Sequence, residues 1–190
     1  PAENAIGGDW YDGPGIEFFE MMKEKLGDLP IVAEDLGDLF DSVKELLEDT
    51  GYPGMKVLEF AFDSGEANDY LPHHYTENCV VYTGTHDNDT LMGWAAQAKP
   101  EDVAYAKSYC NIGDDEEFNW GIIRTAYNSV ADTAIIQMQD ILGLGTEARI
   151  NVPSTLGGNW VWRIDSTMLT DELANRLKEM VISSSRLEEN

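Results

Sequence analysis

The chain has 190 residues, 43% of them hydrophobic, which suits a globular domain with a packed core and excludes a disordered chain. Its 36 Asp and Glu outnumber its 12 Lys and Arg, and the net charge of −24 would repel a nucleic-acid backbone or an anionic membrane surface. We therefore expect neither nucleic acid nor a membrane as a partner.

The cysteine count and the absence of long apolar runs also limit the class of protein. Cys79 and Cys110 are too few for a disulfide framework, and no apolar run reaches the length of a membrane span. We expect a soluble, cytoplasmic protein. The opening Pro-Ala-Glu-Asn lacks an initiator methionine, so we also expect the chain to be a piece of something longer.

The first part of the chain predicts a strand between two helices. Apolar residues at helical spacing predict a helix over residues 15–26. The short apolar run 29–33 predicts a strand that ends at Glu34. A second helix follows, with Asp38 as its N-cap and Gly51 as its end.

The middle of the chain repeats this alternation. Apolar and β-branched residues predict strands over 54–62 and 79–83. A helix is expected near 90–97 and another near 101–110.

The last part predicts a long helix, a strand and a closing helix. Apolar residues recur at intervals of three and four over 115–142, which is typical of one long amphipathic helix. Residues 147–152 resemble a strand, and Thr170 is a suitable N-cap for the closing helix. Strands thus alternate with helices along the chain, which favours an α/β fold with a parallel sheet covered by helices.

Two architectures fit four parallel strands. A closed (β/α)₈ barrel needs eight strands and about 250 residues, so about half of a barrel would be present. An open doubly wound sheet is the alternative, but no G-x-G-x-x-G or P-loop follows a predicted strand, which removes the commonest uses of that fold.

Two predicted strands end in carboxylates. Glu34 follows one strand and Asp87 follows another, and residues in these places lie at the C-terminal face of a barrel, where catalytic groups gather. A pair of carboxylates there suits glycoside chemistry. The alternative is structural, since a carboxylate at the end of a strand often caps a helix or anchors a loop.

Metal binding is a weaker interpretation. The stretch Asp87–Asp89 begins like a calcium loop, but Leu91 stands where the next ligand is needed. A transition-metal site would have to draw on His73, His74, His86 and Asp87. These residues lack a recognisable ligand spacing.

The tryptophans offer a hint of sugar binding. Trp10, Trp94, Trp160 and Trp162 could stack on sugar faces, whereas Trp120 belongs to an apolar helix stripe. Packing in the core is the default expectation for all five.

Longer motifs carry a family resemblance. In chain order they are PIVAEDLGD (30–38), GMKVLEFAFDS (54–64), YLPHHY (70–75), VVYTGTHDNDT (80–90) and ARINVPSTLGGNWVWR (148–163). Together they resemble the C-terminal half of a 4-alpha-glucanotransferase, the amylomaltase or disproportionating enzyme of the alpha-amylase-like barrel superfamily. The resemblance implies a single incomplete domain over residues 1–190, comprising about strands 5–8 of a (β/α)₈ TIM barrel with long helical insertions.

The resemblance also implies roles for individual residues. Glu34, in the A-E-D-L-G motif, would be the general acid/base, and Asp87, in G-T-H-D-N-D-T, would stabilise the transition state. His86 would contact the donor sugar, and Asp63 and Asn151 would add substrate contacts. The implied reaction transfers α-1,4-glucan segments between maltooligosaccharides by a retaining double displacement, without metal or organic cofactor.

Part of the family's machinery is absent from this chain. The nucleophilic Asp lies in an Arg-x-Asp motif on the fourth strand, which would precede residue 1. The only Arg-x-Asp here, at 163–165, lies beyond the eighth strand, and we interpret it as coincidence. Smaller departures from the family's pattern are Asn128, where relatives often carry Trp, and Ile150 and Val152 in the R-x-N-x-P motif.

The missing N-terminal half of the barrel would be a partner alongside the glucan. We expect the fragment alone to be inactive, and four strands with open edges to cause association or marginal stability. Two other functions stay open: a metal-dependent barrel hydrolase, and a non-catalytic glucan-binding or assembly module derived from the enzyme.

Overall fold

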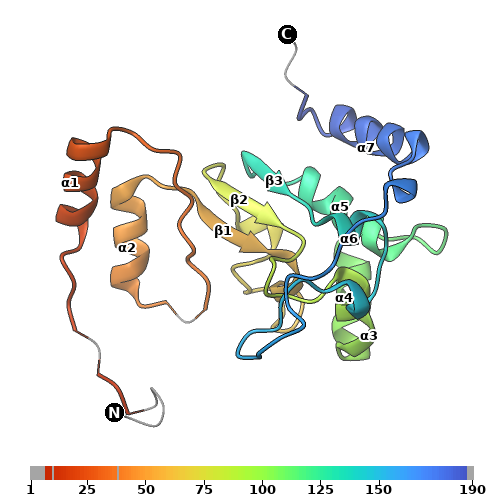
Figure 1. Cartoon of the computed structure of the whole chain (residues 1–190), viewed down its shortest axis with the longest axis horizontal. Helices are drawn as coiled ribbons and strands as arrows, with labels where there is room; N and C mark the ends of the chain where they lie inside the picture. The colour runs from red at the N-terminus through yellow and green to blue at the C-terminus, as the bar shows by residue number, and fades with distance from the viewer. Residues whose placement is uncertain (1–6, 10, 38, 188–190) are drawn as a thin grey trace. The chain divides into compact units, whose positions relative to one another are not determined.

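The computed structural model describes residues 7–9, 11–37 and 39–187 (Figure 1). The chain forms two compact units, Pro1–Gly54 and Met55–Asn190. Within the described residues, every helix is too short or too polar to cross a bilayer.

The first unit contains two packed helices, α1 (Ile16–Leu26) and α2 (Asp41–Thr50). Both were predicted from the sequence. Gly51 ends α2 in the left-handed conformation that glycine adopts readily, as expected. The start of α2 differs, because Phe40 is its N-cap and the predicted cap, Asp38, lies outside the described residues.

The strand predicted over 29–33 is wrong. This segment has no strand assignment, and its described backbone hydrogen bond joins Ala33 N–H to Pro53 O (2.9 Å). A β-strand needs a ladder of such bonds with a neighbour, and one bond does not make a ladder. Leu29 and Val32 are each 44% exposed, so the apolar run is neither a strand nor a fully buried segment.

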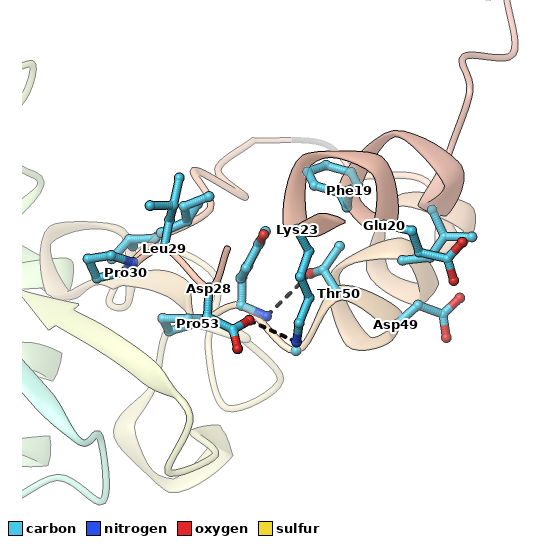
Figure 2. Close-up of a pocket in the computed structure, with 14 residues that line it drawn as sticks. Phe19, Glu20, Lys23, Asp28, Leu29, Pro30, Asp49, Thr50 and Pro53 are labelled. Carbon is cyan, nitrogen blue, oxygen red and sulfur yellow. Dashed lines mark hydrogen bonds and ion pairs between the residues drawn. The ribbon is translucent and has the colours of Figure 1, made fainter. Parts of the chain in front are cut away.

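A pocket of about 560 Å³ lies among α1, α2 and the segment 28–32 of this first unit (Figure 2). Phe19, Leu29 and Pro30 supply part of its apolar lining. Lys23 Nζ pairs with Asp28 Oδ1 (2.8 Å) at its edge. Because α1 and α2 bury no described residue, much apolar surface of this unit stays accessible.

A three-stranded sheet organises the second unit, with strands in the order β1 (Gly54–Val57), β2 (Cys79–Tyr82) and β3 (Thr133–Ile135) (Figure 1). β2 and β3 pair in parallel, with Val81 opposite Ala134. Adjacent strands that follow chain order are typical of a singly wound α/β fold.

Two of the predicted strands are present in this sheet. The one expected over 79–83 is confirmed as β2. The one expected over 54–62 is shorter, because the chain leaves β1 for a 3₁₀ turn at Leu58–Phe60.

The long helix predicted over 115–142 is wrong. The chain forms α5 (Phe118–Tyr127), then β3, then α6 (Met138–Ile141). After α5, Asp132 N–H donates to Glu77 O (2.8 Å), just ahead of β2. This bond brings the chain to the sheet edge, where tertiary pairing outweighs the helical spacing of the apolar residues.

The other helices follow the prediction closely. They are α3 (Leu91–Gln97), α4 (Pro100–Tyr109) and α7 (Asp171–Ser183). The side chains of Thr90 and Thr170 cap α3 and α7 by accepting from backbone N–H groups in the first turn.

The strand predicted over 147–152 is also wrong. Thr146–Ala148 is a 3₁₀ turn, and the described residues that follow it, up to 187, contain no strand. The carbonyl of Ile150 accepts from Trp160 N–H (2.7 Å), and that of Asn151 accepts from the Arg149 side chain (2.8 Å). These backbone groups are therefore satisfied by a loop rather than by a sheet.

The core of the second unit lies between the sheet and its helices. Its fully buried members share large aliphatic side chains: Leu58, Leu71, Val81, Leu91, Ile122 and Ile123. Both cysteines are buried, and burial raises the pKa of Cys110 to about 11, so its thiol stays protonated at neutral pH.

Gly93→Ala is expected to destabilise the second unit by about 1–3 kcal/mol, because a methyl group there overpacks α3. It would collide with the Asp89 carboxylate and lie 2.6 Å from Thr146 Oγ1. Urea unfolding followed by circular dichroism measures the change. Gly113→Ala is the matched control, since its Cβ would meet open space; equal losses in both variants would contradict the packing argument.

Candidate functional site

The loop that follows β2 is shaped by its own polar side chains. Asn88 Oδ1 accepts from Thr85 N–H (2.9 Å) and Thr85 Oγ1 (2.7 Å), and Thr85 Oγ1 accepts from Asp87 N–H (3.3 Å). These bonds fold residues 85–88 into a tight turn. The side chains of His86 and Asp87 are left 49% and 45% exposed, so both are available to a ligand.

Asp87 is the centre of a polar cluster. Asn151 Nδ2 donates to Asp87 Oδ1 (2.6 Å), and His86 Nε2 lies 3.3 Å from the same oxygen. Asn151 comes from a loop 64 residues further along the chain. The structure therefore brings together three of the five residues that the resemblance implicated.

Arg149 joins this cluster, and the sequence reasoning missed it. Its Nη2 donates to the backbone O of Asp87 (2.6 Å), and its Nε donates to the backbone O of Asn151 (2.8 Å). One guanidinium thus fixes the backbones of both residues that meet at Asp87 Oδ1. The available signal was its place two residues before Asn151 in the motif of residues 148–163.

Arg149→Met is expected to lower the free energy of unfolding by about 2–3 kcal/mol, because two charge-assisted hydrogen bonds are lost, one of them to the distant Asp87 loop. Urea unfolding provides the measurement. Arg163→Met serves as control, since exposed Arg163 bonds only the nearby carbonyls of Trp160 and Trp162 and should matter less. A larger loss at Arg163 would contradict this assignment.

Trp160 lies beside the cluster. Its ring centroid is 5.1 Å from that of His86, its side chain is 57% exposed, and its backbone φ is +62°. A bulky residue in this left-handed conformation carries strain, which is often found at ligand sites.

The other tryptophans have different surroundings. Trp94 stacks on Phe118 and Trp120 is buried, so both belong to the packed interior. Trp162 is half-buried, and Trp10 lies outside the described residues.

Glu34 and Asp63 are not part of this cluster as the structure describes it. Glu34 is exposed and belongs to the first unit, whereas Asp87 belongs to the second. Asp63 is exposed, and its Oδ1 accepts from Asn68 Nδ2 (3.4 Å), which also donates to Ser64 Oγ (2.8 Å). The roles of both residues stay predictions.

The histidines considered for a metal site are engaged elsewhere. His73 Nδ1 bonds the Tyr109 hydroxyl (2.8 Å), and His74 Nδ1 bonds Asn68 O (2.9 Å). In the part of the chain that the structure describes, no three or more His, Cys, Asp or Glu side chains form a metal-binding group. The four-residue site raised as an alternative therefore does not form among these residues.

In the Arg-x-Asp motif at 163–165, the Asp side chain caps a turn. Asp165 Oδ1 accepts from Thr167 N–H (2.8 Å) and Thr167 Oγ1 (2.7 Å), which caps the 3₁₀ turn Ser166–Met168. These bonds lower the pKa of Asp165, as expected for a capping carboxylate.

Three acids near the loop that carries Asp87 are buried, and of these the sequence reasoning named only Asp89, as part of a calcium loop. Asp140 accepts from Thr83 Oγ1 (2.5 Å) and Leu91 N–H (2.8 Å), and burial raises its pKa to about 6. Asp89 accepts from Gln97 and Thr146 (both 2.8 Å).

Glu59 is the third buried acid. Burial, reinforced by the nearby Asp140 and Asp89, raises its pKa to about 9. The signal in the sequence was a lone carboxylate within the apolar run VLEFAF, residues 57–62.

Comparison with known proteins places this site in a family. The family model described as 4-alpha-glucanotransferase matches residues 1–169. The chain belongs to this family. Members similar to it include 4-alpha-glucanotransferases from Clostridium butyricum, 47% identical over 98% of the chain, and from Thermus thermophilus, 42% identical over 96% of it. The chain spans 38% of the length of each.

Solved structures agree with this membership. Amylomaltase from Streptococcus agalactiae in complex with acarbose matches 93% of the chain with a TM-score of 0.89 and 42% identity. The chain covers 36% of that protein. Amylomaltase from Corynebacterium glutamicum, 18% identical with a TM-score of 0.57, shows the likeness of fold alone. The α/β fold with a small parallel sheet is therefore shared with amylomaltases.

Proposed function

We propose that the chain supplies the acid/base and the charge-stabilising carboxylate of a 4-alpha-glucanotransferase, as the C-terminal half of its (β/α)₈ barrel. The observation that carries this proposal is Asp87, held by Asn151 and flanked by His86 at the carboxyl end of parallel strand β2 in a member of that family. Barrel enzymes place their catalytic groups at this end of the strands.

Asp87 is suited to bind a sugar as positive charge develops. Both of its described side-chain contacts use Oδ1, which orients the carboxylate and leaves Oδ2 for a sugar hydroxyl. Such a bond strengthens as the ring approaches an oxocarbenium ion, so it stabilises the transition state more than the substrate. His86 is placed to contact the same sugar, and Asp63 is proposed to add a contact.

The reaction is a retaining double displacement. In the first step a carboxylate outside this chain attacks C1, the C1–O bond to the leaving glucan breaks, and Glu34 transfers its proton to the departing oxygen. In the second step Glu34 takes the proton of an acceptor 4-hydroxyl, whose oxygen attacks C1 and releases the carboxylate. These steps use no metal or organic cofactor.

The substrate is an α-1,4-glucan or maltooligosaccharide, in starch, glycogen or maltose metabolism. The acarbose complex of the Streptococcus agalactiae amylomaltase supports a carbohydrate ligand for this fold. The first half of the barrel would be supplied by the remaining length of the protein, and the two units of this chain would belong to one catalytic domain. A cytoplasmic location stays a prediction, since some relatives are named chloroplastic.

A chimera tests the proposal. This chain replaces the matching segment of the Clostridium butyricum relative, and maltotriose is supplied as the substrate. We expect glucose and longer maltooligosaccharides, with unchanged activity in the presence of a chelator. A folded chimera that only binds maltotriose would favour the non-catalytic module, and chelator-sensitive hydrolysis would favour the metal-dependent hydrolase.

A further inference from the structure

Glu59 is a buried carboxyl that the proposed reaction does not use. It lies in the 3₁₀ turn after β1, is 7% exposed, and donates its backbone N–H to Thr83 O (3.1 Å) at the end of β2. Among the described residues, Glu59 Oε1 and Gln137 Nε2 are buried side-chain atoms with no hydrogen-bond partner. An acceptor and a donor left in this state need a physical explanation.

Both atoms pack against Gly84. A Cβ built on Gly84 would lie 2.9 Å from Glu59 Oε1 and 3.1 Å from Gln137 Nε2. Two side chains, one from the 3₁₀ turn after β1 and one from the segment between β3 and α6, therefore clamp the backbone three residues before Asp87. The absence of a side chain at Gly84 is what allows this approach.

Three charged residues act on Glu59, and one of them is Arg149, the cation that contacts Asp87 and Asn151. The nearby Asp140 and Asp89 disfavour its anionic form, and Arg149 favours that form more weakly. Because burial adds to the effect of the two carboxylates, Glu59 is neutral at pH 7. Arg149 is then held by the backbone carbonyls of Asp87 and Asn151, and Glu59 does not compete for it as an anion.

We propose that Glu59 is a positioning residue for Asp87, acting through Gly84 and Arg149. The neutral carboxyl packs against Gly84 and leaves the guanidinium on the Asp87 carbonyl. An anion at Glu59 would attract the guanidinium of Arg149 and loosen the pair formed by Asp87 and Asn151. The catalytic consequence rests on the proposed function of Asp87, but the geometry can be tested without any activity.

The test is a pH titration of the 190-residue chain by nuclear magnetic resonance, from pH 5 to 10. The ¹³C shift of the Glu59 carboxyl reports its protonation, and the ¹³C shift of the Asn151 side-chain amide carbon reports its bond to Asp87. We expect both signals to change together with a midpoint near pH 9. A Glu59 midpoint near 4.5, or an Asn151 amide that does not follow it, would overturn the proposal.

Two variants separate positioning from simple packing. Glu59→Gln imitates the neutral carboxyl, so the Asn151 amide should keep its pH 7 position up to pH 10, whereas Glu66→Gln, at an exposed site, should leave the transition as in the wild type. Gly84→Ala should shift the Asn151 amide already at pH 7. A transition that persists in Glu59→Gln contradicts the role of Glu59, and an inactive chimera with the expected titration contradicts only the proposed function.

Discussion

Asp87→Asn is expected to lower kcat for maltotriose disproportionation by about 10²–10³-fold in the chimera, because the amide cannot supply negative charge to the developing oxocarbenium ion. Asn is nearly isosteric with Asp, and its side-chain oxygen can still accept from Asn151, so the loop should keep its fold. The loss should therefore appear mainly in kcat, since the ground-state contacts are largely retained. Initial rates of glucose release measure it.

Asp114→Asn is the matched control, since Asp114 is an exposed carboxylate on a loop of the same unit. It removes one negative charge from the chain and should leave kcat within about two-fold, as expected for a distant surface change. Similar losses in both variants would show that net charge, rather than the place of Asp87, determines the rate. An Asp87→Asn enzyme of normal kcat would remove Asp87 from the mechanism.

The free energy of unfolding of the chain is expected to fall as the pH rises from 6.5 to 8.5, by up to about 1.4 kcal/mol per pH unit. The cause is Glu59, whose folded pKa is raised to about 9 from an ordinary value of 4.5. In this window the native state binds one proton that the unfolded state has lost. The stabilisation is complete below the unfolded pKa and disappears as the pH passes the folded one.

Asp140 contributes in the same direction but at lower pH, because its folded pKa is only about 6. The window above pH 6.5 therefore reports mainly Glu59. Urea unfolding at several pH values gives the slope, which should flatten in Glu59→Gln and remain in Glu66→Gln. A slope unaffected by Glu59→Gln would show that the proton belongs to another group.

Much of the local structure could be predicted from residues that act on their immediate neighbours. The side-chain caps Thr90 and Thr170, and Gly51 at the end of α2, mark helix ends by local hydrogen bonding and backbone freedom. β2 was also predicted, because its short β-branched run favours a buried strand, and Val80 and Val81 are indeed buried.

Strand pairing could not be predicted in the same way, since it depends on distant partners. The segments 29–33 and 147–152 have strand-like composition but no ladder among the described residues. Residues 133–135 have helical spacing but pair with β2. In each case the tertiary partner, which local composition does not specify, decides the secondary structure.

The site shows the same division. The motif containing His86 and Asp87 stood out because a buried run ends abruptly in polar residues. The contribution of Arg149 was hidden, since its bond to Asp87 O spans 62 residues. Glu59 was hidden as well, because its importance comes from burial against Gly84 rather than from any motif.

The measurement that tests the central claim most directly compares maltotriose with α-maltosyl fluoride in chimeras carrying Glu34→Gln or Asp87→Asn. Fluoride departs without being protonated, so an enzyme that lacks only its acid should still release it. We predict that Glu34→Gln loses about 10²–10⁴-fold on maltotriose but retains fluoride release, whereas Asp87→Asn loses both activities. Equal losses of Glu34→Gln on the two substrates would contradict the division of roles between these carboxylates.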